Sequence, residues 1–246
     1  MIYFSDEFSE HYIIKYIYLI LHIVQIISLI MENGIRDAVD LYVEQHTTPE
    51  DTNLSYIRRK THLSTVMPRQ LSGTVQGKLL EMISVMVNPE FILEVGTFTG
   101  YSAYCLQKGL KQGGMLHTIE IKEEYQPAID DFFSRAGVSD KIILHIGDSA
   151  QVIPSLNITF DLAFIDGDKR DYPNCYKQVF DKVRCGGYIL VDNVLWSDKV
   201  LDVQPENNLY TKGIKELNDF IVNDSRSESV MLPLRDGLTL VRKLSN

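Results

Sequence analysis

The chain has 246 residues, of which 45% are hydrophobic, which is enough for the core of one α/β domain with some additional segments. Its net charge of −9 argues against a nucleic-acid-binding surface, because neutralising phosphates requires clustered lysines and arginines. The three cysteines are widely spaced and form no C-x-x-C pair, so they indicate neither a zinc site nor a disulfide framework. A reduced, cytoplasmic protein is the simplest interpretation.

The N-terminal segment differs from the rest of the chain. Residues 13–30 are almost continuously apolar and, as a helix, approach the ~30 Å thickness of a bilayer core, although three polar residues interrupt them. We therefore expect residues 1–30 to be an extension, separate from a single domain of residues 31–246. Three interpretations stay open: an upstream segment outside the native protein, which would then start at Met31; a membrane anchor or membrane contact; and an amphipathic helix that packs on a partner or a second subunit.

The segment between this extension and the first strand is predicted to be helical. Apolar residues at helical spacing predict one helix over Ile35–Glu44 and a stronger one over Thr74–Val87. Between them, Thr48 is the expected N-cap of another helix, with Pro49 at its first position. A polar, irregular segment over Leu63–Gly73 should follow that helix.

From Phe91 onward the pattern alternates between strands and helices. Short apolar runs, typical of parallel strands buried on both faces, occur at Phe91–Val95, Leu116–Ile121, Ile142–Ile146, Leu162–Ile165 and Tyr188–Val191. Helices are expected after the first four strands, at Tyr101–Gly109, Glu123–Ala136, Ala150–Leu156 and Tyr172–Val183. This alternation predicts a doubly wound, Rossmann-like α/β sheet with helices on both faces.

The C-terminal part departs from this alternation. A helix is predicted over Gly213–Val222, followed by strands at Ser229–Leu232 and Leu238–Arg242. The short link between these two strands suits an antiparallel hairpin rather than a crossover. The predicted fold is therefore a mostly parallel sheet that ends in an antiparallel C-terminal hairpin.

The most informative motif is the turn after the first predicted strand, in which Glu94 is followed by Gly96 and Gly100. It lacks the first glycine of the G-x-G-x-x-G turn of dinucleotide binders, and the Glu94 carboxylate would repel a pyrophosphate. It suits a ligand with a cationic group, such as S-adenosylmethionine (SAM), which carries a sulfonium and an amino-acid tail. Glu120, about 20 residues beyond Gly100 at the next strand end, is expected to hold ribose hydroxyls. An NAD-dependent oxidoreductase is the disfavoured alternative.

Acidic and amide side chains also follow the later strands, at the sheet edge where such folds bind ligands. Asp166, Asp192 and Asn193 come from neighbouring strand ends and offer the hard oxygen ligands that Mg²⁺ or Ca²⁺ prefers. Helix capping is the alternative for Asp166 and Asp192, as it is for Ser149 after the third strand. Lys169 is a candidate base for a metal-bound hydroxyl. Its alternative role is that of a solvent-exposed lysine paired with Asp168 or Asp171.

Several blocks of sequence, taken in order and spacing, resemble one family. They are QLSG from Gln70, LEVGTFTGYSA from Leu93, AGVSDKI from Ala136, FIDGDKRDY from Phe164, VDNVLW from Val191 and LPLRDGLTLVRK from Leu232. The chain resembles the cation-dependent, SAM-dependent O-methyltransferases, the group of the caffeoyl-CoA and catechol enzymes, and especially their small bacterial members. The similarity covers roughly Met67–Lys243. Gly167 departs from it, because relatives usually carry alanine there.

The resemblance implies a role for each matching position. Glu94, Gly96 and Ser102 would line the methionine part of SAM, Glu120 would hold the ribose, and Asp148 and Ser149 would border the adenine. Gln70 and Ser72 would cover the cofactor, and Asp166 would lie beside it. A divalent cation, with Mg²⁺ favoured over Mn²⁺ or Ca²⁺, would be held by Asp166, Asp192 and Asn193. Lys169 would match the general base, and Trp196 would wall the acceptor pocket.

The implied activity is methyl transfer from SAM to a hydroxyl of a small catechol-like or other vicinal-diol aromatic acceptor, in a homodimer. The alternative is a non-catalytic SAM-binding protein tethered to a membrane through residues 13–30.

Overall fold

The computed structural model describes His22 and residues 34–35, 37–202 and 208–246. Contacts divide the chain into two units, Met1–Thr48 and Pro49–Asn246. In the first unit, residues 37–45 are helical, as predicted. Apart from His22, the apolar segment 13–30 lies outside the described residues, as does the predicted boundary after residue 30. Within the described part, no helix combines the length and the apolarity needed to cross a membrane. The expected homodimer and cytoplasmic location stay predictions.

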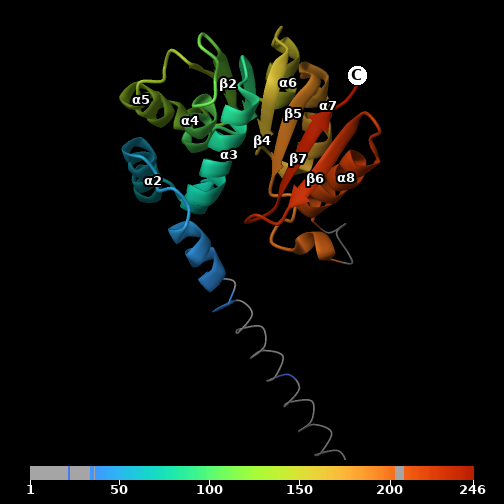
Figure 1. Ribbon diagram of the computed structural model, residues 1–246, viewed down its shortest axis with the longest axis horizontal. Helices are drawn as coiled ribbons and strands as arrows, with labels where there is room; N and C mark the ends of the chain where they lie inside the picture. The colour runs from blue at the N-terminus through green and yellow to red at the C-terminus, as the bar shows by residue number, and fades with distance from the viewer. Residues whose placement is uncertain (1–21, 23–33, 36, 203–207) are drawn as a thin grey trace, which may run out of the picture. The chain divides into compact units, whose positions relative to one another are not determined.

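The second unit is built on a seven-stranded sheet with the order β3-β2-β1-β4-β5-β7-β6, shown in Figure 1. The strands are β1 (Phe91–Val95), β2 (Met115–Glu120), β3 (Ile142–Ile146), β4 (Phe160–Ile165), β5 (Val183–Asp192), β6 (Ser227–Leu232) and β7 (Leu238–Lys243). The first five strands pair in parallel, whereas β7 pairs antiparallel with both β5 and β6. The predicted doubly wound sheet with an antiparallel C-terminal hairpin is therefore confirmed.

Helices cover both faces of this sheet (Figure 1). They are α2 (Thr52–Ser64), α3 (Gly73–Val87), α4 (Tyr101–Gln107), α5 (Gln126–Ala136), α6 (Ser149–Ser155), α7 (Tyr172–Lys182) and α8 (Leu209–Asn223). Single 3₁₀ turns are η1 (Pro68–Gln70), η2 (Glu123–Tyr125), η3 (Lys169–Asp171) and η4 (Lys199–Leu201). Alternate strand residues point to opposite faces, so Ile92 joins the core under α2 to α5 while Leu93 joins the core under α6 to α8.

The start of α2 differs from the sequence-based expectation. Asp51, not Thr48, is the N-cap, and its Oδ1 accepts hydrogen bonds from the backbone N–H groups of Asn53 (3.0 Å) and Leu54 (2.9 Å). Pro49 therefore precedes the helix instead of beginning it. Aspartate caps a helix at least as well as threonine, and Asp51 satisfies two backbone N–H groups of the first turn.

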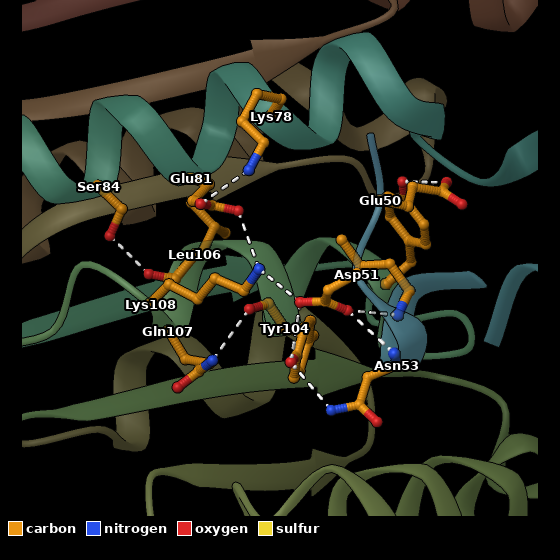
Figure 2. Close-up of polar contacts among 12 residues, drawn as sticks. Glu50, Asp51, Asn53, Lys78, Glu81, Ser84, Tyr104, Leu106, Gln107 and Lys108 are labelled. Carbon is orange, nitrogen blue, oxygen red and sulfur yellow. Dashed lines mark hydrogen bonds and ion pairs between the residues drawn. The ribbon is translucent and has the colours of Figure 1, made fainter. Parts of the chain in front are cut away.

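A cluster of polar side chains ties α2 to α3 and α4, and Figure 2 shows Lys108 between two acids. Lys108 Nζ lies 2.8 Å from Asp51 Oδ2 and 3.0 Å from Glu81 Oε2. These contacts raise the pKa of Lys108 and hold the pKa values of Asp51 and Glu81 low, despite their partial burial. At the other end of α2, the hydroxyls of Thr61 and Thr99 lie 2.9 Å apart. Helix α2 is thereby fixed against the glycine turn that follows β1.

Replacing Lys108 with Met should lower the melting temperature, because Asp51 and Glu81 would lose the cation they share. Partly exposed ion pairs contribute about 1 kcal/mol at most, which corresponds to a fall of roughly 3 °C in a domain of this size. Thermal unfolding followed by circular dichroism at pH 7 measures this. Lys111→Met removes an exposed lysine nearby and is the control. An equal melting temperature for wild type and Lys108→Met would contradict a stabilising role for the cluster.

Candidate active site

Four carboxylates lie on one face of the sheet at the carboxyl ends of its strands, and the strand register explains why. On β1, Glu94 is two residues from Ile92, and on β2, Glu120 is four residues from Leu116; both apolar side chains pack under α2 to α5. Because side chains alternate between the two faces of a strand, Glu94 and Glu120 point to that same face. Asp166 and Asp192 follow Ile165 and Val191, which are paired in register between β4 and β5. The structure thus brings together acids that the sequence placed only at strand ends.

Glu94 lies in the most enclosed position of the four. The Thr118 hydroxyl, paired with Glu94 across β1 and β2, donates a hydrogen bond to its Oε2 (2.5 Å). Its Oε1 is buried and has no hydrogen-bond partner among the described residues. Burial raises the pKa of Glu94 to about 8, against the opposing effect of the Ser102 and Thr118 hydroxyls, and the nearby carboxylates of Asp166 and Glu120 add to the rise. An unpaired buried carboxylate oxygen of this kind favours a cationic partner.

The two glycines of the turn are required because other parts of the chain approach their Cα atoms closely. Gly96 has φ +103°, and a Cβ there would lie 2.4 Å from the backbone oxygen of Asp166. Gly100 has φ +91°, and a Cβ there would lie 2.7 Å from the ring of Phe133 on α5. At both positions the backbone is left-handed and there is no room for a Cβ atom, so no other residue fits. The first glycine brings the ends of β1 and β4 together, and with them Glu94 and Asp166.

Glu120 has a structural role in addition to its predicted one. Its Oε2 accepts the backbone N–H of Phe98 (2.8 Å) and its Oε1 accepts that of Lys122 (2.9 Å). Phe98 has φ +51°, so Glu120 holds the glycine turn in a conformation that a phenylalanine seldom adopts. Each carboxylate oxygen has a second lone pair, which leaves Glu120 able to accept ribose hydroxyls. The ribose contact stays a prediction.

The remaining predicted cofactor residues lie on segments around the same edge. Asp148 is the N-cap of α6 and accepts the backbone N–H of Ala150 (2.9 Å), so the capping alternative considered for Ser149 is wrong. Ser149 is instead the first residue of that helix. Ser72 is buried just before α3, whereas Gln70 lies exposed at the end of η1.

Asp166, Asp192 and Asn193 lie together, and neither aspartate caps a helix. Burial raises the pKa of Asp192, and the nearby Asp166 carboxylate raises it further. Asp192 Oδ2 accepts Gln76 Nε2 (2.7 Å), and its Oδ1 accepts the backbone N–H of Asn193 (2.8 Å). In the described part of the chain, no three His, Cys, Asp or Glu side chains are arranged as a metal site, so the predicted cation site rests on two carboxylates and one amide.

Lys169 faces this group instead of solvent. Its Nζ lies 2.7 Å from Asp166 Oδ1, and its side chain is only 12% exposed. The alternative of a solvent-exposed lysine paired with Asp168 or Asp171 is therefore wrong, because Lys169 pairs with Asp166 while Asp168 pairs with Arg170. Gly213 on α8 explains the placement of η3, since a Cβ there would lie 2.3 Å from the backbone oxygen of Lys169. The close packing of α8 thus positions the lysine.

An aromatic wall stands beside these groups. Trp196 stacks on Tyr210 of α8, with ring centroids 5.9 Å apart and planes 17° from parallel. Arg170 lies over the Tyr210 ring and Lys199 over the Trp196 ring, at 5.3 Å and 5.8 Å from the ring centroids. The placement of Trp196 agrees with a wall for an aromatic acceptor, and that role stays a prediction.

Sequence reasoning missed four residues that the structure brings to this edge. They are Thr118, which binds Glu94; Gln76, which binds Asp192; Tyr172, whose buried hydroxyl donates to the Asp192 backbone oxygen (3.0 Å); and Asp236, which receives hydrogen bonds from Asn193 and Ser197. Thr118 was detectable in principle, because it lies two residues before Glu120 on the same strand face. The other three come from segments distant in sequence.

Glu94→Gln should stabilise the ligand-free protein at high pH. The pKa of about 8 in the folded protein exceeds the ordinary glutamate value of 4.5, so the stability that protonated Glu94 provides is complete below pH 4.5 and is lost as the pH rises to about 8. Glutamine cannot ionise, so the free energy of unfolding of the variant relative to wild type should rise by on the order of 3 kcal/mol between pH 5 and pH 8. Melting temperatures measured across this pH range should show the same gain. A difference in melting temperature between variant and wild type that does not change with pH would contradict a Glu94 carboxylate buried without a countercharge.

Comparisons with known proteins agree with this geometry. The family model described as O-methyltransferase matches residues 44–244. Caffeoyl-CoA O-methyltransferase 1 of Eucalyptus globulus is 33% identical over 181 residues, which cover 69% of this chain and 73% of that protein. Caffeoyl-CoA O-methyltransferase of Petroselinum crispum is 32% identical over 183 residues, covering 69% and 75%.

Solved structures agree as well. An O-methyltransferase from Bacillus cereus in complex with S-adenosylhomocysteine (SAH) has a TM-score of 0.77 and 28% identity, covering 84% of this chain and 97% of that one. TomG from Streptomyces achromogenes, in complex with SAM and involved in tomaymycin synthesis, has a TM-score of 0.77 and 27% identity, covering 85% and 96%. This chain therefore belongs to the O-methyltransferase family, as the sequence blocks predicted, and it is a SAM-dependent O-methyltransferase.

Proposed function

We propose that this enzyme transfers the methyl group of SAM to one hydroxyl of a catechol-like acceptor, with a divalent cation held by Asp166, Asp192 and Asn193. The observation that carries the proposal is the position of two neighbouring carboxylates beside Lys169, on the same sheet face as Glu94. In the reaction, the sulfonium S–CH₃ bond breaks, an O–CH₃ bond forms and the hydroxyl proton leaves. The products are a methyl ether and SAH. The name of the plant relatives, caffeoyl-CoA O-methyltransferase, supports a catechol acceptor.

Glu94 is proposed to bind the amino group of SAM. Its Oε1 is the buried oxygen without a hydrogen-bond partner among the described residues, and a protonated amine would supply both the hydrogen bond and the countercharge. Glu120 and Asp166 add negative charge close to Glu94, which suits a ligand that carries both an ammonium and a sulfonium.

The residues present fit a divalent cation. Asp166 and Asp192 are close enough for one to raise the pKa of the other, and a cation between two such carboxylates removes their repulsion. Their oxygens and the Asn193 amide oxygen are hard ligands, the class that Mg²⁺ prefers. When bound, the cation would polarise the acceptor hydroxyl and favour its ionised form.

Lys169, in its neutral amine form, is proposed to receive the hydroxyl proton. Its amine is 2.7 Å from Asp166 Oδ1, which holds it beside the carboxylates toward which the acceptor oxygens would be directed. Trp196, which stacks on Tyr210, would line one side of the acceptor pocket and help to orient the acceptor ring. Because a methyl transfer depends on alignment, orientation by these rings would contribute directly to the rate.

Methyl transfer from labelled SAM to a panel of catechols that includes caffeoyl-CoA tests this function. We expect turnover with Mg²⁺, its loss in EDTA and its recovery when Mg²⁺ is restored. Asp166→Ala should lose at least about 100-fold in rate, whereas Asp130→Ala, at an exposed site on α5, should keep the wild-type rate. Full activity in EDTA, or in Asp166→Ala, would refute the cation site.

Binding of SAH should strengthen as the pH rises toward 8. The ligand amine pairs with ionised Glu94, whose pKa is about 8 in the free protein, so binding below that pH must displace a proton. Calorimetric titrations at pH 6 and pH 8 should show a dissociation constant that falls by up to about tenfold per pH unit. Glu94→Gln should remove this dependence, and Glu228→Gln, an exposed acid on β6, should retain it. Equal affinities for wild type at both pH values would exclude Glu94 as the amine partner.

A further inference from the structure

Gln76 is a buried glutamine, 1% exposed, on the face of α3 that points toward the sheet edge. Its Nε2 donates to Asp192 Oδ2 (2.7 Å), and its Oε1 accepts a hydrogen bond from Arg235 Nη1 (3.3 Å). A guanidinium can only donate hydrogen bonds, so Arg235 requires the amide oxygen on its own side. The Gln76 amide is thereby oriented with its N–H₂ toward Asp192.

This hydrogen bond constrains the geometry of the Asp192 carboxylate. Asp192 is buried, its Oδ2 accepts the Gln76 N–H₂ and its Oδ1 accepts the backbone N–H of Asn193. Because each oxygen is held by a donor, the plane of the carboxylate is fixed, and with it the direction of the lone pairs that remain for a cation.

Arg235 connects the same chain of contacts to the predicted cofactor-covering segment. Its Nη1 also donates to the backbone oxygen of Ser72, and its Nη2 lies 3.5 Å from that of Arg69. Arg235 has φ +51°, an unfavourable backbone conformation for arginine at the turn between β6 and β7. The neighbouring Asp236 accepts hydrogen bonds from the Ser197 backbone N–H and from Asn193 Nδ2 (3.4 Å). One hairpin turn therefore contacts both the segment over the cofactor and the predicted cation ligands.

We propose that Arg235 and Gln76 form a positioning relay that runs from the Ser72 segment to Asp192 and sets the cation affinity of the site. The proposal rests on the cation site of the proposed function. It assigns no chemical step to either residue. Gln76 acts through Asp192, and Arg235 acts through Gln76 on the cation and through Ser72 on the cofactor.

The test is a titration of the full-length protein with Mn²⁺, in which free Mn²⁺ is measured by electron paramagnetic resonance in the absence of SAM. Gln76→Leu should weaken Mn²⁺ binding by about 10-fold to 100-fold, the usual effect of removing a residue that orients a metal ligand. Its affinity for SAH, measured by calorimetry, should match wild type. Arg235→Ala should weaken both Mn²⁺ and SAH binding, since it contacts both segments.

Two further variants make the test specific. The double variant Gln76→Leu/Arg235→Ala should bind Mn²⁺ no more weakly than Gln76→Leu alone, because a relay predicts non-additive effects. Gln107→Leu, which removes another buried glutamine whose Nε2 donates to the Tyr104 backbone oxygen (3.1 Å), should bind Mn²⁺ as wild type does. Melting temperatures identify any variant that fails to fold, and Arg235→Ala then tests the relay without Gln76→Leu.

The outcomes separate this proposal from the proposed function. Wild-type Mn²⁺ affinity in Gln76→Leu or in Arg235→Ala would overturn the relay while leaving the cation site intact. Additive losses in the double variant would show that the two residues act independently and would also overturn it. A wild-type protein that binds no Mn²⁺ would overturn the cation site itself, and the relay with it.

Discussion

Buried negative charge at the carboxyl edge of the sheet is the constraint on which the rest of this structure depends. Glu94, Glu120, Asp166 and Asp192 share one face because of strand register, and three of them are less than a tenth exposed. Burial raises the pKa of Glu94 and Asp192. Such an arrangement is unfavourable for an empty protein, because the hydrogen bonds from neighbouring groups replace only part of the hydration that ionised carboxylates lose on burial. Its benefit is the binding of cationic groups, and SAM is a cationic co-substrate.

The scaffold tolerates this charge because packing and hydrogen bonds fix the surrounding backbone. Gly96 lets the ends of β1 and β4 approach, Glu120 holds the turn through two backbone N–H groups, and α2 is fixed against that turn through Thr61. The ion pairs of Lys108 with Asp51 and Glu81 then anchor the start of α2. Rigid placement is what a methyl transfer needs, since the rate depends on alignment of donor and acceptor more than on any single reactive side chain.

Residues outside the predicted ligand set determine how that set is presented. Tyr172, Gln76 and Asp236 contact the Asp192–Asn193 pair from three elements, and Arg235 extends this layer to Ser72. A buried carboxylate has several lone pairs, and the hydrogen bonds already made decide which of them remain for a ligand. The β6–β7 hairpin therefore contacts the predicted ligand set as well as completing the sheet.

The sequence by itself determined the alternation of strands and helices, the hairpin and the chemical types at each strand end, because buried strands, glycine turns and caps leave local patterns. Strand bounds at Phe91–Val95 and Ile142–Ile146 were predicted without error, whereas the start of α2 was misplaced because Thr48 and Asp51 are both acceptable caps. Only the tertiary structure decided that Lys169 pairs with Asp166 rather than with Asp168 or Asp171, that Gln76 contacts Asp192 and that Arg235 contacts both Gln76 and Ser72. The contacts of Gln76 and Arg235 join segments 116 to 163 residues apart, and they follow from packing between elements, which no local pattern encodes.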